Sequence, residues 1–352
     1  IEFGMKTFGT FVIFALIGTV FAPSSEACTR VVYKGLSDCV ITARSMDWKS
    51  EIDPNIWVFP RGMQRNGEVG PLSVQWTSKY GSIIASAWDI ATTDGMNEKG
   101  LCANILWLAE SDYPVFDPKG KTPGISISLW AQYVLDNFAT VAEAVEHFRN
   151  EPFVIVSDYI PGTQKFTTLH LSISDAGGDN AIFEYIDGKL VIHHDPSYVV
   201  MTNSPVFEQQ LALDDYWKGI PGTIALPGTN RAADRFVRAS YYIGVIPRTD
   251  DIRTSIASVF SVIRNCSVPF GISSESEPNI SSTRWRSVSD QKNLVYFFET
   301  ALTPNVFWVT LKDFDLSEKG RVMKLDLSNY ATYNGKANKS FKPAKPFKFL
   351  GI

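Results

Sequence analysis

The fold is decided by residues 22–33, which carry the sequence APSSEACTRVVY. The first half is small and polar, and Ser25 and Ala27 occupy the small-x-small positions of a secretory cleavage site. The second half, which starts at Cys28, runs into a β-rich segment that predicts a core strand. Cleavage after Ala27 would therefore leave a cysteine as the first residue of a buried strand.

The residues before this stretch predict export. Residues 1–4 precede the first methionine and are interpreted as a vector-derived remnant, and residues 5–27 as a signal peptide. Lys6 supplies the positive start, and the apolar run 11–22 is too short to span a bilayer. We expect a periplasmic or secreted protein that has no membrane partner after the leader is removed.

The composition excludes several classes of protein. The 352 residues are 45% hydrophobic and 20% charged, as in an ordinary globular protein. The formal net charge of -4 provides no basic field, so nucleic acid is not an expected partner. No two cysteines have CxxC or zinc spacing, and whether one disulfide forms among Cys39, Cys102 and Cys266 stays open.

Predicted strands and helices alternate in blocks. In chain order, strands, helices, strands, helices and strands occupy residues 29–106, 126–148, 168–193, 206–263 and 282–311. Asp187 and Gly188 predict a tight hairpin turn, which makes the strands beside it antiparallel. This order favours an α+β layered fold over a parallel βαβ sheet. We expect one domain over residues 28–335 and a solvated, Lys/Pro-rich tail over residues 336–352.

A cysteine at a new N-terminus combines two catalytic groups. Its α-amine has an ordinary pKa of about 7.7–8.0, and its thiol has one of about 8.5. The amine can therefore act as general base for the thiol at neutral pH, and no histidine is required. Such a site still needs a group that holds the amine and a donor for the oxyanion. Arg44 and Asp47 are candidates for fixing the thiolate and the amine through charge-assisted hydrogen bonds. Taken alone, these two residues are more typical of a structural ion pair.

Six short motifs follow one another along the chain after the leader. They are CTR at 28–30, ARSMDW at 43–48, DGMNEKGL at 94–101, MTNSP at 201–205, LPG at 226–228 with RFVR at 235–238, and STRW at 282–285. Together they resemble the choloylglycine hydrolase and penicillin V acylase family, and the match spans the chain from Cys28 onward. The resemblance implies an N-terminal nucleophile hydrolase, a four-layer αββα sandwich in which maturation frees the cysteine.

The resemblance also implies a role for each of five residues. Cys28 would be the nucleophile and, through its amine, the base, and Arg44 and Asp47 would flank and orient it. Asn203 would donate a hydrogen bond to the oxyanion, and Arg235 would stabilise the charged site. On the same predicted helix, Arg231 and Arg238 are expected at the surface. No cofactor and no metal ion are required by this mechanism.

The substrate pocket is where this chain departs from many members of the family. Trp107 stands where many of them carry asparagine or tyrosine, and we expect its backbone N–H to preserve the oxyanion donor. Asn104, three residues earlier, is also assigned to the substrate site. Trp48 and Trp107 are expected to line an acyl pocket that suits a phenoxyacetyl or fatty acyl group, although two core tryptophans would give the same pattern.

The expected activity is hydrolysis of a linear amide C–N bond in a small N-acyl compound. The pattern of tryptophans at positions 48 and 107 is similar to that of the Gram-negative penicillin V acylases. This resemblance implies penicillin V and N-acyl homoserine lactones as substrates, and it implies a homotetrameric assembly. Conjugated bile salts are the alternative substrate class. The alternative of another kind is a non-catalytic exported lipoprotein or binding protein anchored at Cys28.

The histidines support no competing site of their own. His193, His194 and Asp195 are neighbours on a predicted strand, so their side chains alternate between faces and are poor joint metal ligands. A papain-like cysteine and histidine pair stays open as an alternative. The histidines available for it are His147, His170, His193 and His194, none of them in a recognisable sequence context.

Overall fold

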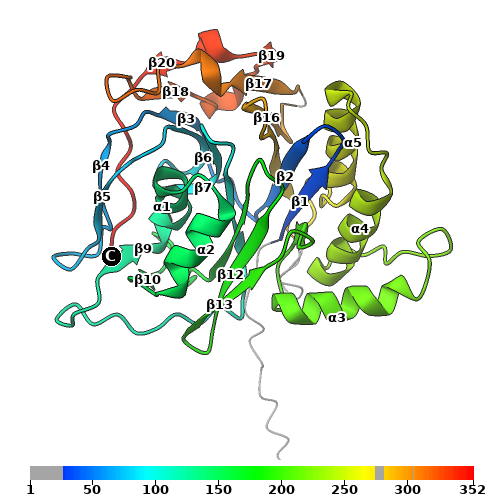
Figure 1. The fold of residues 1–352 in the computed structure, drawn as a ribbon, viewed down its shortest axis with the longest axis horizontal. Coiled ribbons are helices and arrows are strands. Elements are labelled where there is room, and N and C mark those ends of the chain that lie inside the picture. Colours follow the sequence, from blue (N-terminus) through cyan, green and yellow to red (C-terminus); the bar gives the residue numbers. More distant parts are fainter. Residues whose placement is uncertain (1–26, 274–280, 304) are drawn as a thin grey trace, which may run out of the picture.

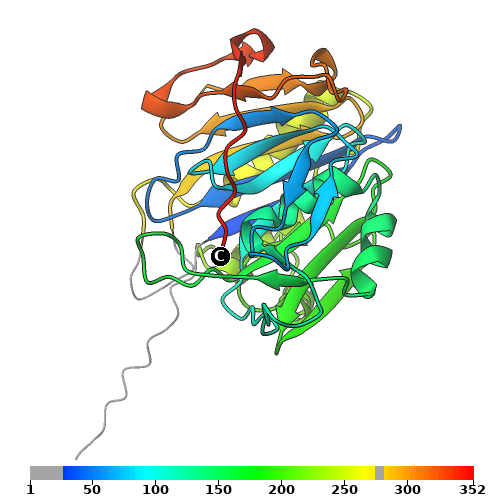
Figure 2. The ribbon, with the colours of Figure 1, turned by 90° about the vertical axis from the view of Figure 1, so that its left-hand side faces the viewer.

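Two large sheets lie face to face, with helices on both outer sides (Figures 1 and 2). The structure is a computed structural model that describes residues 27–273, 281–303 and 305–352. The predicted remnant and all but the last residue of the predicted signal peptide lie outside these ranges. The arrangement confirms the predicted α+β fold with four layers, αββα.

The first sheet carries Cys28 and has seven strands. Its order is β14 (Val200–Met201), β1 (Cys28–Lys34), β2 (Val40–Asp47), β15 (Thr283–Asp290), β16 (Val295–Thr300), β17 (Phe307–Thr310) and β19 (Gly335–Lys336). Antiparallel register sets Cys28 opposite Met46 and Asp47 opposite Thr283. The start of β1, the end of β2 and the start of β15 therefore meet at one end of the sheet, although β15 is far from the other two strands in sequence.

The second sheet has nine strands and packs against the first. Its order is β13 (Lys189–His194), β12 (Asn180–Ile186), β11 (Leu169–Ser174), β8 (Cys102–Trp107), β7 (Ala91–Asn97), β6 (Ser82–Ala87), β3 (Ile56–Phe59), β18 (Met323–Leu325) and β20 (Lys342–Pro343). The predicted hairpin turn is confirmed, because Asp187 and Gly188 both have positive φ, 50° and 71°. Two short ribbons pair β4 (Gln64–Asn66) with β5 (Gln75–Thr77) and β9 (Gly124–Ser126) with β10 (Val154–Val156).

Among the residues that the structure describes, five α-helices form the outer layers (Figure 1). On the nine-stranded sheet lie α1 (Trp130–Asn137) and α2 (Val141–Arg149), and with the seven-stranded sheet lie α3 (Phe207–Lys218), α4 (Ala232–Val245) and α5 (Ile252–Asn265). Thr140 caps α2 by accepting a hydrogen bond from the Glu143 N–H. In the described part of the chain, no helix combines the length and apolar character needed to cross a bilayer.

Two hydrophobic cores explain why so many strand positions are apolar. One core fills the space between the sheets and extends under α4 and α5, and the other lies between the nine-stranded sheet and α1 and α2. Strand β8 serves both, because Cys102 and Leu106 face the first core while Ala103 and Ile105 face the second. A strand covered on both faces has no polar side, so its sequence loses the alternation typical of a surface strand.

The C-terminal tail is not the solvated extension that we predicted. Residues 336–352 cross the molecule, shown in red in Figure 2, and Phe349 is buried. The Leu350 carbonyl accepts hydrogen bonds from the Ser126 and Ser128 hydroxyls at 2.7 and 2.8 Å. Aromatic residues stand among the lysines and prolines of this tail, and the buried Phe341 and Phe349 hold it in place.

Candidate active site

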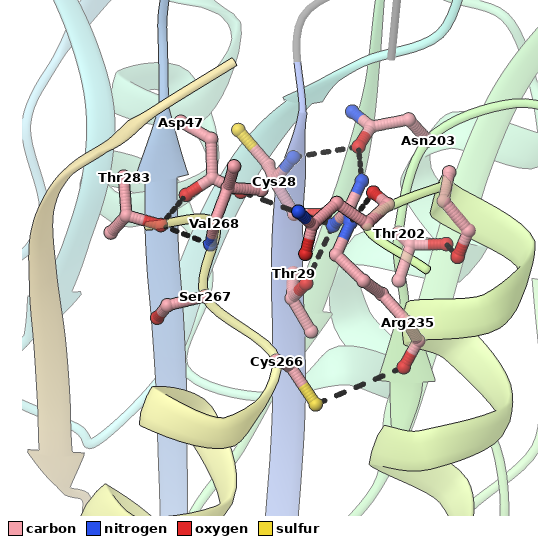
Figure 3. A network of polar contacts seen from close by, with 12 residues as sticks. Cys28, Thr29, Asp47, Thr202, Asn203, Arg235, Cys266, Ser267, Val268 and Thr283 are labelled. Carbon is pink, nitrogen blue, oxygen red and sulfur yellow. Dashed lines mark hydrogen bonds and ion pairs between the residues drawn. The ribbon is translucent and has the colours of Figure 1, made fainter. Parts of the chain in front are cut away.

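The backbone nitrogen of Cys28 is held by one side chain. Cys28 is buried at the start of β1, and its nitrogen donates a hydrogen bond to Asn203 Oδ1 at 2.6 Å (Figure 3). In the chain described here this nitrogen belongs to the peptide bond that follows Ala27, so it stands in for the α-amine that cleavage would release. The acceptor at Asn203 is therefore positioned to orient that amine.

Asn203 is itself fixed by several partners. Its Oδ1 also accepts a hydrogen bond from Arg235 Nη2 at 2.8 Å, and its Nδ2 donates to the Trp107 carbonyl at 2.7 Å. An amide nitrogen carries two N–H donors, and the Trp107 carbonyl takes one of them. The structure thus brings Asn203 to Cys28, with its oxygen toward the nitrogen of the nucleophile. The oxyanion role that the resemblance implies for Asn203 would fall to the other N–H of its Nδ2.

Arg235 connects α4 to the start of β1. Its guanidinium is fully buried and donates to the Cys28 carbonyl, and to Thr29 Oγ1 at 2.7 Å. Burial lowers the pKa of Arg235, and the nearby Asp47 carboxylate opposes that shift. Because its donors contact both β1 and Asn203, Arg235 fixes their relative positions (Figure 3).

The other two arginines of this helix behave differently from each other. Arg231 is exposed, as expected. The prediction that Arg238 lies at the surface is wrong, because this residue is buried and donates to the carbonyls of Pro227 and Thr229, both at 2.7 Å. Arg238 therefore holds the loop that leads into α4, which includes the LPG motif.

Asp47 places a carboxylate beneath the site at the end of β2. Its Oδ1 accepts a hydrogen bond from Thr283 Oγ1 at 2.5 Å, and its Oδ2 lies 4.0 Å from Arg235 Nη1. An irregular register between Thr283 and Trp285 in β15 places Thr283 opposite Asp47. Burial raises the pKa of Asp47 to about 6, while the Arg235 charge and the Thr283 hydroxyl act in the opposite direction.

We expect this carboxyl to make stability pH-dependent. The folded-state pKa of about 6 exceeds the ordinary value of 3.8, so the folded protein holds the proton more tightly than the unfolded chain does. The stabilising contribution is complete below the unfolded pKa, and about 3 kcal/mol is lost as the pH rises through the folded pKa. In Asp47→Asn this titration is absent. The unfolding free energy of the variant minus that of the parent, measured in urea, should therefore rise by up to about 3 kcal/mol between about pH 3 and pH 7.

The exposed Asp53→Asn variant is the control for removing one carboxylate. A difference between Asp47→Asn and the parent that stays constant with pH would contradict the prediction. The same slope in the Asp53→Asn variant would assign the effect to overall charge.

Arg44 is the cation closest to the thiol. Its Nη2 lies 3.6 Å from Cys28 Sγ, its Nη1 donates to the Thr93 carbonyl at 2.7 Å, and its guanidinium stacks on Trp285 with 4.9 Å to the ring centroid. Burial raises the pKa of the Cys28 thiol and the Asp47 charge adds to this, whereas the Arg44 charge lowers it. A thiol with a raised pKa is protonated at neutral pH, so attack requires a base beside it.

A cavity opens at the Cys28 thiol, and its wall is largely apolar. Trp48 and Trp107 line it, as predicted for the acyl pocket, with ring centroids 5.7 Å apart. Trp88, which no sequence pattern indicated, also lines it and packs against Trp48 with ring centroids 6.1 Å apart. Aliphatic side chains from several elements complete the wall, among them Ile52, Ile105, Ile127, Leu169 and Leu350. Such a surface suits an apolar or aromatic acyl group.

Asn104 is not brought into this cavity. It lies on β8 with its Nδ2 donating to Asp94 Oδ2 at 2.5 Å, and it is buried. Side chains alternate along a strand, so residues 104 and 107 point to opposite faces. The side chain of Asn104 therefore belongs to the interior, and a contact with substrate has no support in this geometry.

The histidines make contacts elsewhere, and the cysteines are free. No histidine of the described ranges lines the cavity. His193 contacts Glu184, whereas His194 contacts Asp179, so the two do not converge on one site. His170 lies 2.9 Å from the Thr202 carbonyl and supports the segment that carries Asn203. All four cysteines are free, so Cys39, Cys102 and Cys266 form no disulfide with one another in this structure.

Comparisons with known proteins agree along almost the whole chain. Residues 28–333 match a family model, which is described as linear amide C–N hydrolases of the choloylglycine hydrolase family. The chain is 53% identical over 356 residues to penicillin V acylase from Pectobacterium atrosepticum, with 95% of each chain covered. It superposes on the structure of penicillin V acylase from Agrobacterium tumefaciens with a TM-score of 0.88 and 62% identity, covering 92% of this chain and 100% of the other. Conjugated bile acid hydrolase from Lactobacillus acidophilus is 29% identical over 203 residues, 51% of this chain and 61% of the other.

Proposed function

The chain belongs to the choloylglycine hydrolase family of linear amide C–N hydrolases, and from this premise we propose that it cleaves the phenoxyacetyl amide of penicillin V. The observation that carries the proposal is the position of Cys28: its nitrogen is held by Asn203 and its thiol faces a tryptophan-lined cavity. Cleavage before Cys28 turns that nitrogen into an amine, which supplies the base that a protonated thiol needs.

The proposed reaction proceeds through a thioester. The α-amine of Cys28 takes the thiol proton, the sulfur attacks the amide carbonyl, and the amine passes the proton to the departing nitrogen. Water then hydrolyses the thioester, with the same amine as base. The second N–H of Asn203 Nδ2 and the backbone N–H of Trp107 are the proposed oxyanion donors, and Arg44 stabilises the thiolate.

The acyl group is proposed to lie among the tryptophans. A phenoxyacetyl ring gains burial and edge-to-face contact with Trp48, Trp88 and Trp107, whose ring pairs already adopt this geometry. The acyl chain of a long-chain N-acyl homoserine lactone would pack against the same apolar wall, and it would be held there by hydrophobic burial alone. A conjugated bile salt is the alternative, and it is supported more weakly because the bile acid hydrolase relative is more distant.

Export and assembly belong to the same proposal. The leader-like residues 5–27 support a periplasmic or secreted location, because removal of a leader is also what frees Cys28. A homotetramer is proposed from the family resemblance. Size-exclusion chromatography with light scattering on the protein that begins at Cys28 tests the assembly.

A competition assay tests the proposed substrate. Protein beginning at Cys28 receives penicillin V, a glycine-conjugated bile salt and a long-chain N-acyl homoserine lactone together, and each product is followed chromatographically. We expect penicillin V to be consumed first. Preferred cleavage of the bile salt would overturn the assignment of the acyl group and leave the cysteine mechanism in place, and no cleavage of any of the three would overturn the proposed function.

A further inference from the structure

The C-terminal tail supplies part of the cavity wall. Leu350 lines the cavity together with Ile90 and Ser128, and its backbone is hydrogen-bonded to both of them. Its N–H donates to the Ile90 carbonyl at 2.8 Å, and its carbonyl accepts from the Ser128 hydroxyl at 2.8 Å. The match to the family model ends at residue 333. The wall therefore includes a residue for which that match does not account.

The backbone around Leu350 is held on both sides. Phe349, directly before it, is buried in the core beneath α1 and α2, and the Arg65 guanidinium lies 5.3 Å from its ring centroid. On the other side, the Ile352 N–H donates to the Glu68 carbonyl at 2.9 Å. None of these contacts uses the Leu350 side chain. A substitution of that side chain should therefore change the cavity and leave the tail in place.

A chain of contacts relates Leu350 to the nucleophile. Arg44 Nη2 lies 3.6 Å from Cys28 Sγ, and Arg44 Nη1 donates to the Thr93 carbonyl at 2.7 Å. Thr93 follows Ile90 by three residues, which is about 10 Å of extended chain, and the Ile90 carbonyl binds the Leu350 N–H. An acyl group that is attached at Cys28 and runs along the start of β7 therefore approaches Leu350.

The cavity wall beside Leu350 favours hydrocarbon. Ile90 lines the cavity there, and so do the polar residues Ser128 and Thr92. The Ser128 hydroxyl donates to the Leu350 carbonyl and the Thr92 hydroxyl to Gln132 Oε1, both at 2.8 Å. A hydroxyl has one proton to donate, so neither offers its O–H to a ligand. An apolar acyl group gains burial here, whereas a polar one would lose hydrogen bonds to water.

We propose that the Leu350 side chain limits the length of the acyl group that the cavity accepts. The preferred substrates are then amides of compact apolar acids, such as phenoxyacetic acid, over amides of long linear fatty acids, whose ends meet this side chain. The inference rests on the proposed function and adds the residue that determines acyl length. The acyl group occupies the cavity in the transition state for acylation, so the effect appears in kcat/KM.

The test compares two amides of the same amine, 6-aminopenicillanic acid. One is penicillin V, and the other carries a linear dodecanoyl group in place of phenoxyacetyl. In Leu350→Ala the dodecanoyl-to-phenoxyacetyl ratio of kcat/KM should rise about tenfold, because a pocket larger by a few carbon atoms tolerates the longer chain. In Leu350→Phe the ratio should fall about fivefold, because the larger side chain crowds the same space. General loosening of the tail would not move the ratio in opposite directions.

Ile352→Ala is the matched control. This residue belongs to the same tail and is apolar, but its side chain is exposed and lies outside the cavity lining, so the ratio should equal that of the parent. Thermal unfolding of each variant checks that it is folded.

The outcomes separate the inference from the proposed function. If protein beginning at Cys28 cleaves no penicillin V, the proposed function fails. If it cleaves penicillin V and the ratio in Leu350→Ala equals or falls below that of the parent, the function stands and the role of Leu350 is refuted. The same rise in Ile352→Ala would also refute it, because the anchoring of the tail, and not the Leu350 side chain, would then limit acyl length.

Discussion

Replacing Cys28 by alanine should abolish hydrolysis of penicillin V, with a fall in kcat of roughly four orders of magnitude or more. Alanine at a cleaved N-terminus retains the amine and its hydrogen bond to Asn203 Oδ1, so the loss isolates the sulfur. The raised pKa of the thiol makes this residue a poor nucleophile without its base, and among the described residues that line the cavity Cys28 is the one that carries a thiol. The measurement is the steady-state release of phenoxyacetate by protein of verified N-terminal mass.

Two further substitutions sharpen this result. Cys28→Ser keeps the amine and a potential nucleophile, and we expect a severe but incomplete loss because an alcohol is harder to deprotonate than a thiol. Cys39→Ala is the matched control, since Cys39 lies outside the cavity and should not affect turnover. Thermal unfolding of Cys28→Ala should resemble that of the parent. Substantial turnover by folded Cys28→Ala protein would refute the mechanism.

Local sequence patterns predicted the strand that carries the nucleophile, because its evidence is contiguous. Cys28 and the β-rich run after it lie together, and a hairpin brings Arg44 and Asp47 back beside Cys28. The contacts of Asn203 and Arg235 with Cys28 span 175 and 207 residues, so only the resemblance to a family could assign them. No local pattern encodes a contact between segments so far apart.

The errors have physical causes in the same molecule. Asn104 was assigned to the substrate site through its distance from Trp107 in sequence, although strand alternation turns residues three apart to opposite faces. Trp88 was missed because it lies in a tight turn, at φ 48°, where composition gives no sign of such a turn. Leu350 reaches the cavity from the tail, where five lysines and two prolines are interspersed among the apolar residues and indicated a solvated segment.

A single residue retained before Cys28 should inactivate the protein almost as completely as loss of the sulfur. With Ala27 in place, the Cys28 nitrogen is an amide, which keeps its hydrogen bond to Asn203 but has no basic lone pair. The thiol, whose pKa burial raises, then has no base beside it, since no histidine of the described chain lines the cavity. We expect kcat/KM to fall roughly a thousandfold, which lies within the range of about 10²- to 10⁴-fold that a general base contributes.

Two proteins that differ by one residue test this, one beginning at Ala27 and one at Cys28, each checked by intact mass. Both are expected to fold, because Ala27 is buried directly before the start of β1, where the pairing of β1 with β2 is intact. Equal activity would show that the α-amine is not the base, and a histidine or water would have to be sought. The same masses address the alternative of a lipid anchor, because a lipid adduct on Cys28 of the exported protein would block the amine as completely as Ala27 does. An unmodified amine at Cys28 and activity confined to that form would together leave the N-terminal nucleophile as the one mechanism that fits the geometry.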